Sequence, residues 1–191
     1  MSEIQEPATG AIFPSTLRPW DGGVYKNLGA GPRIMKVAFI SIKVYAVSLY
    51  VPIERLPLAS GTALSEAGSP RVIQMQLARN IAGSQFSDTM RKSMGPSMSQ
   101  DLASLTKFCD FITQQQLQTG TVITLLLGPA SEVDVNVDQV SAVSGGDMSQ
   151  AKPQLSLQSE AFCASLLQIY LGPKSVIPEA KKAWLANAVR G

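Results

Sequence analysis

One stretch of the sequence limits the fold more than any other. From Arg33 to Val51 the chain consists mainly of β-branched and apolar residues with isolated lysines and serines between them, which is typical of β-strands. At roughly 3.3 Å per residue, a straight strand of this length would span about 60 Å, far more than an ordinary strand. We therefore expect the chain to reverse near the middle of the stretch, as a hairpin or a sharply bent pair of strands.

The same stretch contains the longest candidate for a membrane span, residues 37–51. Lys43 interrupts it, so no apolar run reaches the roughly 18 residues that a spanning helix needs. The first nine residues carry acidic and no basic side chains, unlike a targeting segment. We expect a soluble protein, and both the cytoplasm and a plastid remain open as its compartment.

Hydrophobic periodicity and breaker residues predict the other elements. They are, in order, short strands and loops over 11–31, a short helix or loop over 56–70, a half-buried strand over 71–78, a helix over 84–98 that Gly95 and Pro96 break, a helix with an apolar stripe from Leu102 to Ile112, a hairpin of 121–127 and 133–140 with one face in water, a loop over 142–153, a helix from Ser159 to Gly172, and a last helix that Pro178 begins.

This order favours an α+β fold, in which an antiparallel sheet carries a layer of helices on one face. The 191 residues, 45% of them hydrophobic, are enough for one buried core, and no break in composition indicates a second domain. We expect a flexible N-terminus over residues 1–10 and a single domain over residues 11–191.

The composition excludes several kinds of chemistry. The chain contains no histidine, so charge-relay triads, Cys-His nucleophiles and histidine-ligated zinc are ruled out. Cys109 and Cys163 cannot form a zinc site alone, and each lies in an apolar helical context that is typical of a buried free thiol. A net charge of +2 with scattered basic residues offers no cationic face for nucleic acid. We expect no metal, no cofactor and no nucleic-acid partner.

A set of short motifs resembles one known family. Residues 28–33 read LGAGPR, and Tyr45, twelve residues after Arg33, begins the segment YAVSLY. These segments resemble the Gly-x-Gly-x-Arg turn and the Tyr-Ala-x-Gly-Leu-Tyr strand of chalcone isomerase-like proteins. Residues 77–86 are similar to the strand-to-helix joint of that family, and residues 162–178 to its closing helix pair. The motifs follow the family's order, so the resemblance implies its fold, an open-faced β-sandwich, for the whole domain.

The resemblance also implies a site. In the true isomerases an arginine, a threonine, a tyrosine, an asparagine and a late threonine or serine surround a cleft in which a flavonoid phenolate attacks an enone. Only the arginine is retained here, as Arg33. The other positions correspond to Tyr45, Phe86, Ser93 and Ile169. Phenylalanine and isoleucine cannot donate a hydrogen bond, and the loss of one well-placed donor can cost on the order of a hundredfold in rate. We therefore expect no catalytic residues.

The pair of Arg33 and Tyr45 is similar to the noncatalytic, fatty-acid-binding branch of the family, in which an arginine and a tyrosine hold the ligand's carboxylate at one end of an apolar cavity. A guanidinium binds a carboxylate through two parallel hydrogen bonds, and a phenol adds a third donor. We expect a monomer that binds a fatty acid or a similar amphipathic carboxylate in an apolar cleft. The expected ligand-binding residues are Arg33, Tyr45, Phe86, Ser93 and Ile169.

Two alternatives remain open at this stage. The first is a chalcone-flavanone isomerase of weak or altered activity, which would take a flavonoid-like ligand and use Arg33 and Tyr45 as catalytic residues. The second is a ligand-free auxiliary protein. In that case Arg33 would be a surface arginine after a glycine turn, and Tyr45 a core residue whose hydroxyl reaches the edge of the strand.

Overall fold

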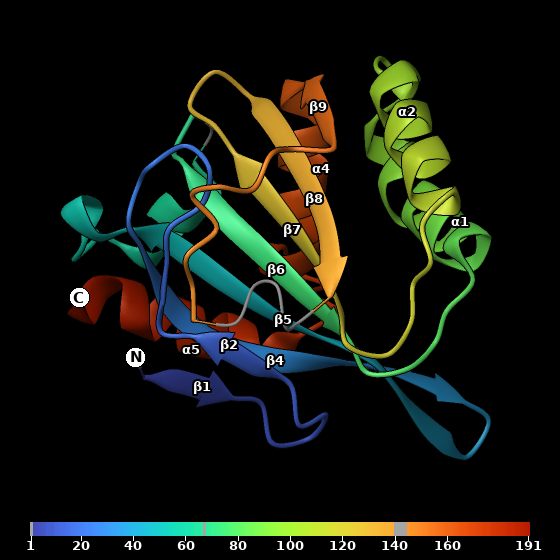
Figure 1. The fold of residues 1–191 in the computed structure, drawn as a ribbon, viewed down its shortest axis with the longest axis horizontal. Helices are drawn as coiled ribbons and strands as arrows, with labels where there is room; N and C mark the ends of the chain where they lie inside the picture. The colour runs from blue at the N-terminus through green and yellow to red at the C-terminus, as the bar shows by residue number, and fades with distance from the viewer. Residues whose placement is uncertain (1, 67, 140–144) are drawn as a thin grey trace.

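The centre of the molecule is an open, seven-stranded antiparallel sheet (Figure 1). The computed structural model describes residues 2–66, 68–139 and 145–191. The strands in their spatial order are β3 (Thr16–Leu17), β4 (Tyr25–Val37), β5 (Ile40–Pro52), β6 (Arg71–Leu77), β7 (Thr121–Leu127), β8 (Glu132–Gln139) and β9 (Leu155–Gln158). Two short strands, β1 (Glu3–Gln5) and β2 (Ile12–Pro14), form a separate antiparallel pair, so part of the segment expected to be a flexible N-terminus is a strand.

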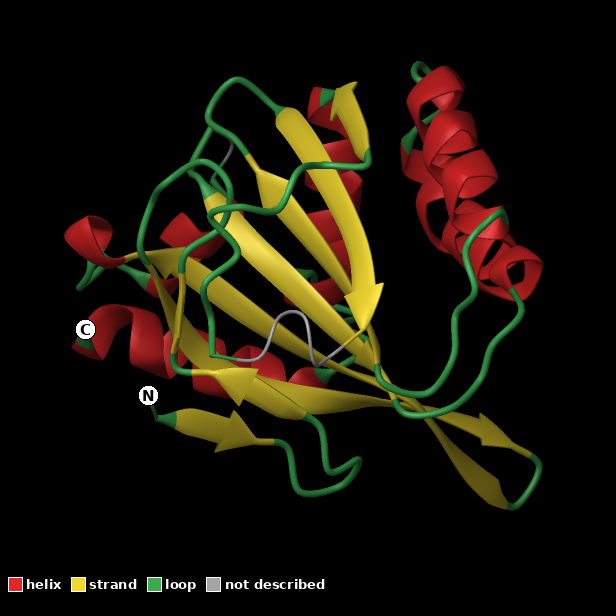
Figure 2. Ribbon diagram, in the orientation of Figure 1, coloured by secondary structure: helices red, strands yellow, loops and turns green. Residues whose placement is uncertain are grey.

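The long helices are α1 (Gly83–Met94), α2 (Leu102–Thr113), α4 (Glu160–Leu171) and α5 (Pro178–Arg190), and the short 3-10 helices are η1 (Ile53–Arg55), η2 (Gly61–Ser65) and η3 (Gly95–Ser97). The helices α4 and α5 lie behind the sheet, α1 and α2 stand side by side beyond one end of it, and loops pass in front (Figure 2). The main core combines β5 to β8 with residues of all four long helices. The fold is therefore α+β with helices on one face of the sheet, as the order of elements predicts.

The first expectation, a reversal within residues 33–51, is confirmed. The strands β4 and β5 form a hairpin whose two-residue turn is Ala38 and Phe39. The strand β4 begins at Tyr25, inside the segment 11–31 that is expected to form short strands and loops. A bulge between Asn27 and Ala30 accommodates Gly29 there at a positive φ of 119°. A glycine tolerates this conformation without steric cost, so a residue that indicates a turn in the sequence lies within a strand here.

The second face of the sheet is also covered, which corrects the expectation of half-buried strands. On this face a smaller cluster forms from strand and loop residues, namely Leu17, Tyr25, Tyr50, Val72, Val122, Leu126 and Met148. Residue Gln74 of β6 is therefore 1% exposed, and Asn136 of β8, expected on a face in water, is 4% exposed. Val140 and residues 142–144 of the expected hairpin and loop lie outside the described residues.

The end signals of the late helices are confirmed. The Ser159 hydroxyl accepts a hydrogen bond from the Phe162 amide at 3.0 Å and so caps the N-terminus of α4, and Gly172 follows the last residue of that helix. Pro178 is the first residue of α5, where its missing N–H costs nothing. These caps fix where α4 and α5 begin, and therefore which of their residues reach the sheet.

Candidate ligand-binding site

The glycines that precede Arg33 allow α5 to approach β4 closely. A Cβ atom added at Gly31 would lie 2.5 Å from the Ala180 Cβ, so only glycine fits there. The indole nitrogen of Trp184 donates a hydrogen bond to the Gly29 carbonyl at 2.8 Å. The helix α5 thereby contacts β4 at both Gly29 and Gly31. These contacts hold the backbone of β4 just before Arg33.

Arg33 and Tyr45 are directly opposite each other in the pairing of β4 with β5. Residues opposite each other in an antiparallel pair project on the same face of the sheet. Both side chains line one cavity with a volume of about 360 Å³ between this hairpin and α1. The complete lining is Arg33, Met35, Ile42, Val44, Tyr45, Arg79, Ile81, Gln85, Phe86, Thr89 and Met90.

The cavity is apolar over most of its wall, and its only charged lining groups are cationic. No carboxylate lines it, whereas Arg33 and Arg79 supply two guanidinium groups. The Thr89 hydroxyl donates a hydrogen bond to the Gln85 carbonyl at 2.9 Å, so it is already satisfied within α1. The groups that can donate a hydrogen bond to an anionic ligand are therefore the two arginines, the Tyr45 phenol and the side-chain amide of Gln85, and only the arginines carry a positive charge.

Tyr45 belongs to a short chain of buried polar groups. Its hydroxyl oxygen lies 3.2 Å from that of Tyr170, and the Tyr170 hydroxyl donates to the Met75 sulfur at 3.1 Å. In this arrangement Tyr45 donates to Tyr170. Because sulfur is a weak acceptor, Tyr170 can turn and donate to Tyr45 instead. The Tyr45 proton is then free to point at a ligand oxygen.

Burial keeps both phenols protonated. Tyr45 is 9% exposed and Tyr170 is 1% exposed. Burial raises the pKa of Tyr45, and the Tyr170 hydroxyl and the positive charge of Arg33 offset only part of that effect. Burial likewise raises the pKa of Tyr170 well above its usual value. At neutral pH, both side chains therefore act as hydrogen-bond donors rather than as phenolates.

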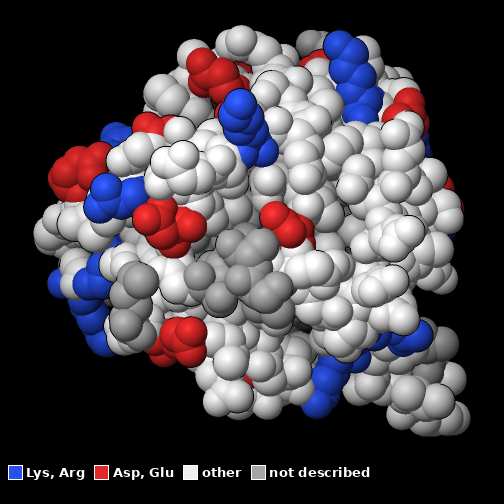
Figure 3. Space-filling view, viewed as in Figure 1, with Lys and Arg blue, Asp and Glu red and all other residues white. Residues whose placement is uncertain are grey.

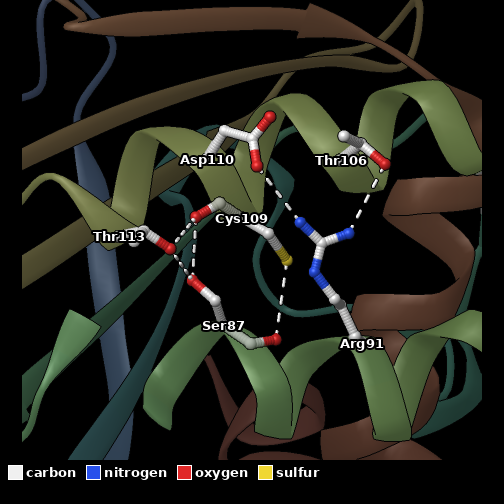
Figure 4. A network of polar contacts seen from close by, with 6 residues as sticks. All are labelled: Ser87, Arg91, Thr106, Cys109, Asp110 and Thr113. Carbon is white, nitrogen blue, oxygen red and sulfur yellow. Dashed lines mark hydrogen bonds and ion pairs between the residues drawn. The ribbon is translucent and has the colours of Figure 1, made fainter. Parts of the chain in front are cut away.

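The helix α1, which forms the opposite wall of the cavity, is fastened to α2 by a network of polar contacts (Figure 4). The Ser87 hydroxyl donates to the Cys109 carbonyl at 2.8 Å and lies 3.0 Å from the Thr113 hydroxyl. At the surface, the Arg91 guanidinium lies 3.2 Å from a carboxylate oxygen of Asp110. The two helices therefore behave as one unit, which positions Phe86 and Met90 against the hairpin.

The structure brings three of the five expected ligand-binding residues together at this cavity. Arg33, Tyr45 and Phe86 line it, and the Tyr45 and Phe86 ring centroids are 6.5 Å apart. Ser93 lies about 10 Å further along the axis of α1 than Phe86, and its side chain is exposed. Ile169 packs at the edge of the main core and does not line the cavity. Its neighbour Tyr170 occupies the position next to Tyr45.

Four residues with polar groups at or beside the cavity were not among the expected ones, namely Arg79, Gln85, Thr89 and Tyr170. Arg79 is exposed and lies at the joint between β6 and α1, and only its position in the segment LARNI indicates it in the sequence. Tyr170 is part of an apolar helical stripe, so its sequence context favours an ordinary core residue. Its hydrogen bond to Tyr45 depends on the rotation of α4 against β5, which the sequence does not specify.

The cysteines and the acidic residues suggest no metal site. Within the described residues, no three His, Cys, Asp or Glu side chains come together in a way that could hold a metal ion. Cys109 is buried, Cys163 is half-buried, and both thiols are free. Burial raises the pKa of Cys163 to about 11, so this thiol is largely protonated and unreactive at neutral pH.

An open antiparallel sheet backed by helices, with a partly cationic cavity between one hairpin and the first helix, defines an α+β domain with a candidate small-molecule site. The family described as chalcone isomerase-like matches residues 9–186, which is nearly the whole chain. The protein belongs to this family. A search of curated proteins found no match.

A solved structure supports the same fold. The crystal structure of a fatty-acid binding protein from Arabidopsis thaliana is similar to this chain with a TM-score of 0.74 at 17% sequence identity, and the match covers 98% of each chain. At this identity the similarity shows the architecture. None of the helices in the described parts of the chain is both long enough and apolar enough to cross a membrane.

Proposed function

We propose that this protein binds a fatty acid or a similar amphipathic carboxylate in the cavity and does not transform it. The observation that carries the proposal is the placement of Arg33 and Tyr45, which are opposite each other on β4 and β5 and line the same cavity. The fold that the chain shares with the Arabidopsis fatty-acid binding protein supports the proposal.

The polar side of the cavity suits a carboxylate. Arg33 presents a guanidinium group, and within the described residues no Asp or Glu oxygen lies within 4.0 Å of its nitrogens. Tyr45 is a neutral donor, and its positive neighbour favours an anionic acceptor beside it. A hydrogen bond to a charged group contributes roughly 1.5–3 kcal/mol, so two such groups fix one end of the ligand.

The apolar side of the cavity suits an alkyl chain. Six lining side chains are apolar, namely Met35, Ile42, Val44, Ile81, Phe86 and Met90. Each buried methylene contributes about 0.8 kcal/mol. The volume of about 360 Å³ is near the lower end of the range of about 300–1,000 Å³ for small-molecule sites, which favours a single chain over a bulky polycyclic ligand.

A displacement assay tests the proposal. A dansyl-labelled fatty acid should bind to the purified protein, and dodecanoate should displace it. Arg33→Ala should weaken binding of dodecanoate by on the order of tenfold to a hundredfold, because a charged hydrogen bond is lost. Arg190→Ala, which removes an exposed arginine at the far end of α5, is the matched control and should leave binding unchanged.

Two results would contradict the proposal. One is equal affinity of the Arg33→Ala variant and the parent protein for dodecanoate. The other is a loss of chalcone absorbance above the spontaneous rate that Arg33→Ala abolishes, since this would assign the cavity to isomerisation instead. Mass spectrometry of lipids extracted from the purified protein provides an independent readout of the native ligand.

A further inference from the structure

The outer part of the β4–β5 hairpin projects beyond the rest of the molecule (Figure 1). The pairing of β6 with β5 extends only from Tyr45 to Tyr50, and within the described residues no third strand continues it beyond Tyr45. The projecting part exposes large apolar side chains. Phe39, in the turn, is fully exposed, and Ile40 is 67% and Met35 is 40% exposed.

The register of the hairpin makes its projecting part amphipathic. Side chains alternate between the two faces along each strand, and opposite residues share a face. Met35 is opposite Ile42, whereas Ile34 is opposite Lys43 and Lys36 is opposite Ser41. One face therefore carries Met35, Ile40 and Ile42, and the other carries Ile34, Lys36, Ser41 and Lys43.

The apolar face of the hairpin continues into the cavity. Met35 and Ile42 form part of the cavity lining, next to Arg33. An apolar surface therefore runs from the exposed turn at Phe39 along the hairpin to the proposed carboxylate site. Monomeric proteins rarely expose a connected apolar surface without a partner for it.

The charge around the hairpin has one sign. Between Asp21 and Glu54 the chain has no acidic residue, but it has four basic ones, Lys26, Arg33, Lys36 and Lys43. Over the rest of the visible face, acidic and basic side chains are interspersed, whereas blue side chains and no red ones appear where the hairpin leaves the body of the molecule (Figure 3). The surface that would lie beside the exposed apolar residues is therefore complementary to an anionic partner.

We propose that the tip of the β4–β5 hairpin docks this protein on the surface of an anionic lipid bilayer. Phe39 and Ile40 enter the boundary between headgroups and acyl chains, and Lys36 and Lys43 lie at the lipid phosphates. An exposed apolar group beside basic side chains is the combination that binds this interface. The cavity then opens towards the membrane, from which an amphipathic carboxylate can enter. That last step rests on the proposed function, whereas docking itself does not.

Sedimentation with lipid vesicles tests the docking. The full chain should bind vesicles that contain phosphatidylglycerol more tightly than vesicles of phosphatidylcholine alone, and added salt should weaken this binding. Lys36→Gln with Lys43→Gln should weaken binding by about 25-fold, which is about fivefold for each charge removed. Phe39→Ser with Ile40→Ser should weaken it by on the order of tenfold or more.

Two double variants serve as matched controls. Leu102→Ser with Val189→Ser removes apolar residues that are 53% and 43% exposed elsewhere on the surface, and it should leave vesicle binding unchanged. Lys107→Gln with Lys174→Gln changes the net charge by the same amount as the hairpin variant, at exposed positions of α2 and of the loop after α4. It should also retain binding.

Three results would overturn the docking proposal. They are no binding to the anionic vesicles, equal losses in the hairpin variants and their controls, and a dimer in sedimentation velocity that Phe39→Ser with Ile40→Ser abolishes while vesicles are not bound. Displacement of the dansyl-labelled fatty acid without vesicles is measured separately, and the hairpin variants should retain it. Vesicle binding by a protein that does not bind the fatty acid would support docking and contradict the proposed function alone.

Discussion

Replacing Gly31 by alanine tests whether the close contact between β4 and α5 holds the strand that carries Arg33. The added Cβ would lie 2.5 Å from the Ala180 Cβ and 3.3 Å from the Ala180 Cα. Both residues are buried, so neither can move into solvent without separating the helix from the sheet. Overpacking of this kind costs typically about 1–3 kcal/mol. For a domain of this size, that corresponds to a fall in Tm of roughly 2–12 °C.

The assay is thermal unfolding followed by the fluorescence of Trp184, which is buried in α5. Gly95→Ala is the matched control, since no atom lies within 4 Å of a Cβ at that position. Ala180→Gly should relieve the clash at a cost of about 1 kcal/mol for glycine in a helix. The loss of unfolding free energy in the double variant should therefore be smaller than the sum of the losses in the two single variants, by about 1–2 kcal/mol. A Gly31→Ala variant as stable as the parent, or two effects that simply add, would refute this reasoning.

Two further predictions concern the buried polar groups. Tyr170→Phe should weaken dodecanoate binding by about threefold to tenfold in the displacement assay, because Tyr45 loses the hydroxyl that can turn and donate to its oxygen while the Tyr45 proton points at the ligand; unchanged affinity would exclude this role of Tyr170. The Cys163 thiol, whose pKa burial raises to about 11, should be alkylated by iodoacetamide more slowly than a free thiol at pH 8, with a rate that rises up to about pH 11. Since the folded-state pKa lies above the ordinary value, the contribution of this thiol to stability is present below pH 9 and is lost as the pH rises towards 11. Mass spectrometry of the labelled protein measures the rate. Alkylation of Cys163 in the folded protein as fast as in the protein unfolded by urea would contradict the expectation.

The hairpin of β4 and β5 was predictable because physical length alone requires a reversal within residues 33–51. The early start of β4 was not predictable in the same way. Gly29, Gly31 and Pro32 indicate a turn by local propensity, whereas the close contacts of Gly29 and Gly31 with α5 belong to a strand that packs against this helix. Tertiary packing decides the conformation of this segment, and a contact across 155 residues of sequence, such as that of Gly29 with Trp184, is not visible in the local pattern.

The same limit explains the candidate site. Arg33 and Tyr45 are joined by the hairpin, but their pairing depends on a register shift between Arg33 and Ile34 that strand length does not determine, whereas Phe86 follows from the buried face of α1. The positions of Ser93 and Ile169 were counted along helices from a family motif. A shift of one position along a helix turns the side chain to a different direction and so decides whether it reaches the cavity. On α4, Tyr170 rather than Ile169 is the residue beside Tyr45.

The open sheet has an edge strand at each end, and both of them are short. The strand β3 has two residues and β9 has four, whereas β4 and β5 in the interior have thirteen each. An edge strand with few free N–H and C=O groups gives an incoming chain little to pair with. The strand β9 offers an incoming chain few such groups, whereas β3 covers only Tyr25 and Lys26 of β4, so the outer edge of β4 beyond these two residues is where, within the described residues, an added strand would find backbone groups to pair with.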